Sequence, residues 1–406
     1  MERTGGKRGG KAPALSRGTT QTGVRLYNER LILSLVRLHG QLPKAEMARL
    51  TGLSAQTVSV IVRQLEAEGL LKRQAPRRGK VGQPLIPFAL DAEGAFSIGL
   101  KVGRRSGDLM LLDLAGGVRK VIHRPYRFPT PQEMLAFVSS GVAELTSGLS
   151  PAQRERISGI GIAAPFELWN WAEDAGAPAE VLNAWREIDL PAAIAGLFPW
   201  PVHFCNDASA ACAAELLFGC GRDLQDFAYF YLGYFIGGGI VLGGSLHLGR
   251  SGNAGAFASF PVTSPGGSPE QLVHGASLAT LEREIGAVGG KPELLWTDQD
   301  GWAEAGDALE LWLQRAAHEI AIAATGAMAV LDCSAVVIDG AVPLAIRSRL
   351  AEAVRQAVGR LDRKGLAVFS VLEGSIGADA RALGAASLPL FENYIINRNV
   401  LFKEGS

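Results

Sequence analysis

The sequence lacks a net charge, has few cysteines and contains no long apolar segment. Its 406 residues include 40 Lys/Arg and 40 Asp/Glu but four cysteines. The cysteines stand in apolar surroundings without Cys-x-x-Cys spacing, which predicts reduced core thiols rather than a disulfide framework. They are Cys205, Cys212, Cys220 and Cys333.

Two further absences concern targeting. The longest apolar run, Ile320–Leu331, is too short to span a bilayer. Residues 1–23 are basic and glycine-rich, but they lack the apolar core of a signal peptide. We therefore expect a cytoplasmic protein, with a chain long enough for two or three globular domains.

The balanced charge is unevenly distributed. Residues 1–90 contain 16 Lys/Arg and 5 Asp/Glu, whereas the remainder contains 24 basic and 35 acidic residues. A basic segment joined to an acidic one indicates a nucleic-acid partner for the basic segment. Residues 1–23 cannot form a core, so we expect a disordered basic tail that either contacts DNA phosphates or keeps the chain soluble.

Three helices are predicted between residues 24 and 68. The apolar stripe of residues 24–38 ends before Gly40, a short helix follows at residues 43–50, and Ser54 is placed to cap a third helix. A helix, a glycine-containing turn and a helix form the helix-turn-helix pattern, although a helical hairpin for dimerisation has the same periodicity. A recognition helix presents its N-terminal side chains to base edges. The candidates are Ser54, Gln56, Thr57 and Ser59, with Arg63 nearer the phosphate backbone.

A basic β-wing is predicted to follow. Residues 70–90 have the pattern of a strand, a basic glycine-containing loop and a second strand, so residues 24–90 form a winged helix-turn-helix domain. Basic wing residues lie along phosphates or in a minor groove, while a solvated basic loop is the alternative. The residues concerned are Arg73, Arg77, Arg78 and Lys80.

The stretch from Phe230 to Gly255 is a candidate ligand site in the acidic part of the chain. It contains three consecutive glycines at residues 237–239 between apolar runs. Glycine is used where φ is positive or where a ligand approaches the main chain, although a tight hairpin without a ligand fits as well. Upstream, Asn206 and Asp207 stand between a short apolar strand and an alanine-rich helix, where sites form in α/β proteins. Asp207 is alternatively a helix N-cap.

These stretches resemble the signatures of the ROK family (repressor, open reading frame, kinase). The chain has CNDASAACAAE where the family has approximately ENDANAAALAE. It has LGYFIGGGIVLGGSLHLGRSGNAGAFAS where the family has approximately LGTGIGGGIVxxGxLxxGxxGxAGEIGH. The resemblance extends from about Ala95 to the C-terminus. It implies an α/β protein with the actin-like ATPase fold, whose first lobe (residues 91–205) is completed by residues 377–406 and whose second lobe spans residues 206–376.

The resemblance also implies a sugar site. Asn206 and Asp207 match sugar-binding positions, where the aspartate is the general base of kinases or a hydrogen-bond acceptor in regulators that do no catalysis. Asn183 and Glu270 are implied as further ligand contacts. The loop from Trp169 to Trp171 borders the sugar in relatives, so its tryptophans either stack on a sugar ring or pack under a contact between the lobes.

The chain departs from the family where metal and phosphate are held. Lys101 replaces the aspartate that holds Mg²⁺ in kinases, and a lysine cannot ligate Mg²⁺. Aromatic Tyr234-Phe235 replaces Thr-Gly in a phosphate loop. The sugar-binding Glu is Ala256 and the zinc-ligating His is Ser259, and the cysteines of the zinc motif are missing, so we expect no metal and no cofactor.

Further replacements affect the ligand and nucleotide segments. The smaller, less polar residues in the sugar motif favour a pocket for a larger or less hydroxylated ligand, or a pocket that no longer binds one. Ala335–Val342 matches the family segment that contacts adenosine, with Asp339 and Ala341 in place of two glycines.

We therefore expect a sugar- or polyol-responsive transcriptional regulator, a repressor, without kinase activity. The alternative is a sugar kinase of the ROK family with an accessory DNA-binding domain. Regulators of the family imply a homodimer or homotetramer, and a two-fold protein binds a pseudo-palindromic operator in double-stranded DNA.

Overall fold

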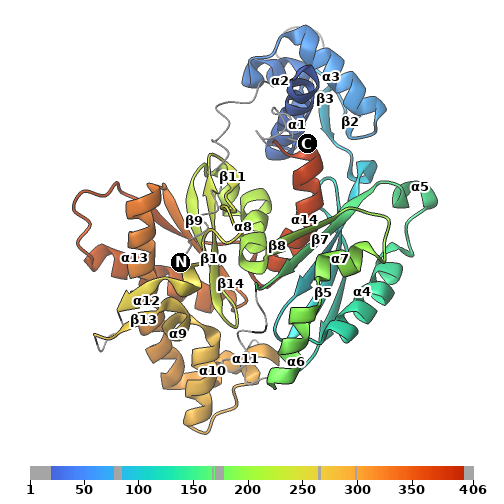
Figure 1. The fold of residues 1–406 in the computed structure, drawn as a ribbon. Helices are drawn as coiled ribbons and strands as arrows, with labels where there is room; N and C mark the ends of the chain where they lie inside the picture. Colours follow the sequence, from blue (N-terminus) through green and yellow to red (C-terminus); the bar gives the residue numbers. More distant parts are fainter. Residues whose placement is uncertain are drawn as a thin grey trace, which may run out of the picture. The chain divides into compact units, whose positions relative to one another are not determined.

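A computed structural model describes residues 20–76, 85–166, 169, 178–263, 267–297 and 300–396 (Figure 1). The chain divides into two compact units. One comprises Met1–Ala89 and Tyr394–Ser406, and the other comprises Leu90–Asn393. The predicted wing residues Arg77, Arg78 and Lys80 lie outside the described residues, as does Trp171.

The first unit contains the three predicted helices. They are α1 (Gln21–His39), α2 (Lys44–Thr51) and α3 (Ala55–Ala67). Ser54 caps α3 as predicted, because its hydroxyl accepts the Thr57 N–H at 3.1 Å. Gly52 adopts a left-handed conformation (φ 71°) between α2 and α3, which permits the sharp turn. The short strands β1 (Leu42–Pro43), β2 (Leu71–Arg73) and β3 (Pro87–Leu90) form a sheet in the order β1-β3-β2, so both predicted wing strands are confirmed.

The second unit begins with a five-stranded sheet in the order β6-β5-β4-β7-β8. Its strands are β4 (Phe96–Val102), β5 (Ser106–Asp113), β6 (Val118–Pro125), β7 (Ile157–Ala164) and β8 (Val202–Asn206). β4, β5 and β6 form an antiparallel meander, whereas β7 and β8 run parallel to β4. Buried side chains of α4 (Pro131–Thr146) and α7 (Leu190–Ala195) join the core of this sheet. α5 (Pro151–Arg154) and α6 (Ala179–Asn183) are short connecting helices.

A second five-stranded sheet has the order β11-β10-β9-β14-β15. Its strands are β9 (Phe227–Leu232), β10 (Ile236–Leu242), β11 (Ser245–Leu246), β14 (Ala335–Gly340) and β15 (Ser370–Glu373). Helices pack on it around the buried Trp312, whose indole N–H donates to the Ser277 carbonyl at 3.0 Å. These helices are α9 (Leu272–Ala276), α10 (Leu278–Ala287), α11 (Leu294–Thr297), α12 (Gly306–Leu331) and α13 (Leu344–Arg360). A separate two-stranded ribbon joins β12 (Pro261–Thr263) and β13 (Pro269–Gln271).

Two alanine-rich helices lie between the two sheets in Figure 1. They are α8 (Asp207–Phe218) and α14 (Ala380–Tyr394). Gly99 of β4 and Gly161 of β7 are paired neighbours, and both lie directly under the α14 backbone. Gly384 of α14 in turn contacts the α8 backbone at Ala210. Small residues on all sides therefore let strands and helices approach closely at the centre of the unit.

One of the roles expected for the three consecutive glycines is not observed. Gly237, Gly238 and Gly239 lie in β10 without positive φ, so the expectation of a left-handed conformation there is wrong. A methyl group at residue 239 would stand 2.5 Å from Cβ of Cys212 on α8, so close packing requires glycine. Positive φ occurs at Gly243 and Gly244, in the hairpin between β10 and β11.

None of the helices within the described residues is long and apolar enough to cross a membrane.

Replacing Gly239 with Ala should destabilise the protein, because the added methyl group forces α8 away from β10. Overpacking of a core costs about 1–3 kcal/mol. Gly148→Ala is the matched control, since no atom lies within 4 Å of the added methyl group and φ is not positive there. Thermal unfolding should show a lower Tm for the first variant alone, and equal Tm values would contradict this packing.

Candidate functional site

A cavity of about 270 Å³ opens at the carboxyl ends of β7 and β8. The first turn of α8, the start of β10 and the chain after β11 form its other walls. The predicted residues Asn206 and Asp207 both line it. The described lining residues are Arg104, Pro165, Phe166, Asn206, Asp207, Ala208, Ser209, Tyr231, Tyr234, Phe235, Ile236, Gly237, Gly238, Asn253, Ala254, Gly255, Ala256, Ala258, Ser259 and Arg381.

Asn206 and Asp207 have different hydrogen-bond partners at the start of α8. The N-cap is Asn206, whose Oδ1 accepts the N–H groups of Ala208 at 3.0 Å and Ser209 at 3.4 Å. Oδ1 of Asp207 also accepts the Ala208 N–H at 3.0 Å, while Oδ2 accepts a hydrogen bond from Nη1 of Arg381 at 3.2 Å. The carboxylate therefore lies at the cavity wall, held between α8 and α14.

Arg381 is the partner that sequence analysis missed. It stands in the first turn of α14, and its guanidinium lies 5.1 Å from the centroid of the Tyr231 ring. Its buried Nε has no hydrogen-bond partner among the described residues. No sequence motif marks this arginine, because its partner Asp207 is 174 residues away.

Lys101 occupies the end of β4 with partners of its own. Its Nζ donates to Ser106 Oγ and to Asp108 Oδ2, each at 2.7 Å, and Asp108 also contacts His123. Burial, and then the nearby Arg381, lower the pKa of Lys101 to about 8. At the position that the resemblance assigns to a metal-holding aspartate, the chain thus has a buried lysine that is already paired, and a lysine cannot ligate a divalent ion.

An arginine–aromatic cluster bridges the two sheets beside this lysine. Arg104 and Arg105 stand in the turn between β4 and β5, and the Arg104 guanidinium lies 4.2 Å from the Phe235 ring centroid. Arg105 lies 5.3 Å from the Tyr234 ring and forms an ion pair with Glu282 of α10. The turn between β4 and β5 and the turn between β9 and β10 are therefore in contact with each other through side chains.

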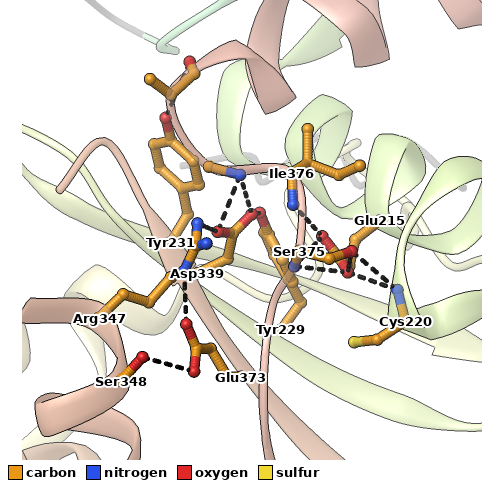
Figure 2. Close-up of polar contacts among 12 residues, drawn as sticks. Glu215, Cys220, Tyr229, Tyr231, Asp339, Arg347, Ser348, Glu373, Ser375 and Ile376 are labelled. Atoms are coloured by element: carbon orange, nitrogen blue, oxygen red, sulfur yellow. Dashed lines mark hydrogen bonds and ion pairs between the residues drawn. The ribbon is translucent and has the colours of Figure 1, made fainter. Parts of the chain in front are cut away.

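The segment that resembles the adenosine contact also forms polar contacts within the protein (Figure 2). Asp339 of β14 accepts hydrogen bonds from Tyr229 Oη at 2.9 Å, Arg347 Nη1 at 2.8 Å and the Gly377 N–H at 3.0 Å. Burial, reinforced by the Glu215 charge, raises the pKa of Asp339. Arg347 also reaches Glu373 at 3.3 Å, so one arginine holds β14 and β15 together.

Glu215 of α8 continues the same network in Figure 2. Its carboxylate accepts the N–H groups of Ser375 at 3.0 Å and Ile376 at 3.3 Å. Successive backbone N–H groups of this kind form an anion-binding nest. Because Glu215 and Asp339 already occupy the N–H groups of residues 375–377, a phosphate would have to displace both carboxylates.

Two predicted ligand residues do not reach the cavity. Asn183 ends α6 with an exposed side chain, and Glu270 lies exposed in β13. Neither lines the cavity described above. Glu270 instead influences the fully buried Glu319 of α12, whose pKa is raised to about 7 by burial and then, in part, by Glu270.

A second cavity of about 550 Å³ adjoins the first. The two share Pro165, Phe166 and Asn253. Trp169 lines the second cavity, beneath the guanidinium of Arg186 at 5.7 Å, and is packed against the core of the first sheet. The described contacts of Trp169 thus lie within the first lobe, and its two predicted roles, stacking on a sugar ring or packing under a contact between the lobes, stay predictions.

The predicted DNA-binding residues fall into two groups. Gln56 and Arg63 are exposed on α3. The other candidates within the described residues have partners: Ser54 and Thr57 share a hydroxyl–hydroxyl hydrogen bond of 2.8 Å, and Ser59 accepts one from Lys44 at 3.3 Å. Arg73 pairs with Glu66 at 2.5 Å. To contact a phosphate, Arg73 would have to break this exposed ion pair, and the free energy lost by breaking it is small.

Two different protein families match the two parts of the chain. The sequence pattern of the ROK family matches residues 97–391, and that of the winged helix-turn-helix DNA-binding family matches residues 25–72. The uncharacterized protein y4fQ of Sinorhizobium fredii is 26% identical over 90% of this chain and 91% of its own length. The xylose repressor of Bacillus subtilis is 22% identical over 91% of this chain and 96% of its own. The crystal structure of a ROK family transcriptional regulator, a homologue of the E. coli MLC protein, superposes with a TM-score of 0.65 and 17% identity, covering 93% of this chain and 99% of that one.

The network around Asp339 can be tested by removing its arginine. Arg347→Met leaves a buried carboxylate without its cation, and breaking a buried pair in this way costs about 3–5 kcal/mol. Arg349→Met, on the same helix, removes an arginine from an exposed pair with Glu310, which is worth about 0–1 kcal/mol. Urea unfolding should rank the two variants in this order, and an equal loss would show that Arg347 does not hold the network.

Proposed function

The chain belongs to the ROK family and carries a winged helix-turn-helix segment, and from this we propose that it is a DNA-binding transcriptional repressor that senses a sugar or polyol. The cavity beside Asp207 is proposed as the effector site. The observation that most strongly supports sensing over catalysis is that the buried, paired Lys101 replaces the metal-holding aspartate.

Phosphoryl transfer needs a metal ion, a phosphate cradle and a group that accepts the hydroxyl proton. Asp207 remains as a possible base, but the ion pair with Arg381 favours its role as a fixed hydrogen-bond acceptor. The arginine–aromatic cluster and the carboxylates of Glu215 and Asp339 lie in the segments that resemble the phosphate and adenosine contacts of kinases. These contacts support a protein that binds its ligand without phosphorylating it.

A covalent route for the signal runs along α14. The helix carries Arg381 in its first turn and ends at Tyr394, where the chain enters the unit that contains the winged helix. Within that unit, the Ile396 N–H donates to Ser34 Oγ of α1 at 3.0 Å. A ligand that changes the Asp207–Arg381 pair therefore acts on one end of a helix whose other end continues into the DNA-binding unit.

We further propose that the repressor acts as a homodimer or homotetramer on a pseudo-palindromic operator, because a two-fold protein recognises a two-fold site. In this proposal Gln56 and Arg63 of α3 approach the DNA, and Arg73, Arg77, Arg78 and Lys80 contact phosphates. Asn183 and Glu270 stay as proposed ligand residues only if the cavity changes shape when it is occupied.

Replacing Gln56 with Ala should weaken operator binding by about 1–3 kcal/mol and relax specificity at one position, because the amide can bond adenine in a bidentate manner. The operator is obtained by selection from genomic fragments, and affinities are measured by fluorescence anisotropy at ~150 mM salt, where non-specific binding is weak. Gln64→Ala, two turns further along α3, is the control and should bind as the wild type does. Equal affinity of the wild type for operator and scrambled DNA would contradict a specific regulator.

A further inference from the structure

We propose that Val60 of α3 recognises a thymine in the operator, by placing its methyl groups against the C5-methyl group of that base in the major groove. This inference rests on the proposed function, in which the winged helix-turn-helix binds a specific operator. Val60 is not among the base-contacting residues expected from the sequence, and its contact predicts a chemical feature of the operator.

The exposed face of α3 is the first argument. Four residues form the buried stripe of this helix, namely Val58, Ile61, Val62 and Leu65. On the other face, Gln56, Val60 and Arg63 are exposed, and spacings of four and then three residues place them in one row. Val60 thus lies between two side chains that are already proposed to approach the DNA.

The hydroxyl side chains at the start of α3 are the second argument, because they are engaged within the domain. Ser54 and Thr57 bond to each other at 2.8 Å, and Ser59 accepts a hydrogen bond from Lys44 at 3.3 Å. Each of these hydroxyl groups would have to release or share a bond in order to reach a base. The exposed Val60 has no polar group to release.

The degree to which Val60 is exposed is the third argument. It is 55% exposed, more than any other large apolar residue among the described residues of the first unit. A β-branched residue is also a weaker helix former than alanine, lysine or arginine. The apolar surface of Val60 is removed from water only when a partner covers it, and that burial is favourable.

The partner that covers this face is duplex DNA. Residues 1–90 carry 16 Lys/Arg and 5 Asp/Glu, so phosphates attract this part of the chain, and residues 25–72 match the winged helix-turn-helix DNA-binding family. A valine side chain has neither a donor nor an acceptor, so it can recognise only an apolar group on a base edge. In the major groove that group is the C5-methyl group of thymine.

The spacing of Gln56 and Val60 predicts where the thymine lies. Four residues advance about 6 Å along an α-helix, and successive bases of a strand are about 3.4 Å apart. The amide of Gln56 suits adenine. Each half-site should therefore contain an adenine contacted by Gln56 and, within about two base steps on either strand, a thymine contacted by Val60.

The test removes the methyl group from the DNA and uses the full-length protein. Each thymine of the selected operator is replaced in turn by deoxyuridine, which keeps the base pair and lacks only the C5-methyl group. Fluorescence anisotropy gives the Kd for each duplex. We expect one thymine in each half-site whose replacement weakens binding about four-fold, which is the effect of losing one buried methyl-sized group.

Three variants assign this effect to Val60. Val60→Ala should bind the thymine and deoxyuridine operators equally, because its shorter side chain does not reach the methyl group. Val60→Ile keeps the apolar contact and should keep the four-fold difference. Val24→Ala, which alters an exposed valine on α1, is the matched control and should keep it too. The Tm of Val60→Ala should not fall below that of the wild type, since alanine is the better helix former.

The outcomes separate this inference from the proposed function. If the wild type prefers its operator but tolerates deoxyuridine at every thymine, the regulator stands and the Val60 contact is overturned. The contact is also overturned if Val60→Ala keeps the deoxyuridine penalty. It is overturned again if this variant weakens binding to all DNA equally and changes the oligomeric mass in sedimentation, because Val60 would then lie in a protein interface. If the wild type binds all sequences equally, both the inference and the specific regulator fall.

Discussion

The ion pair between Asp207 and Arg381 is the contact around which the second unit is arranged. It joins the first turn of α8 to the first turn of α14, two helices that lie between the sheets and touch through glycine and alanine. Both side chains are largely buried, so each charge needs the other. Both side chains also line the cavity.

The segments that the resemblance assigns to phosphate and adenosine form polar and ionic contacts within the protein. Carboxylates from α8 and β14 accept three successive backbone N–H groups, while arginines from the β4–β5 turn stack on aromatic side chains of the second sheet. Buried carboxylates with several donors are expensive to uncover, since the donors lose their partners. In the proposed function these contacts take the place of a nucleotide, and the arginine–aromatic contacts also link the two sheets.

The sequence predicted the fold and some residues of the candidate site. Asn206 and Asp207 could be found because a strand followed directly by a helix fixes their place locally. Arg381 could not be predicted, because it lies in an alanine-rich helix far from Asp207 in the sequence. The two residues meet only in the folded protein. Gly239 was recognised as special, but its role in helix packing depends on Cys212, which no local pattern pairs with it. Asn183 and Glu270 were inferred by family resemblance, and a residue's role transfers poorly when the neighbouring residues have changed.

The most direct measurement of the central claim, that the cavity senses a ligand without phosphorylating it, is sugar-dependent ADP release in the presence of MgATP. A coupled assay over neutral sugars, uronates and sugar phosphates should give no release above the enzyme-free background. Lys101→Asp should not restore it, because the arginine–aromatic cluster and the occupied N–H groups remain. Sugar-dependent ADP release by the wild-type protein would contradict the account.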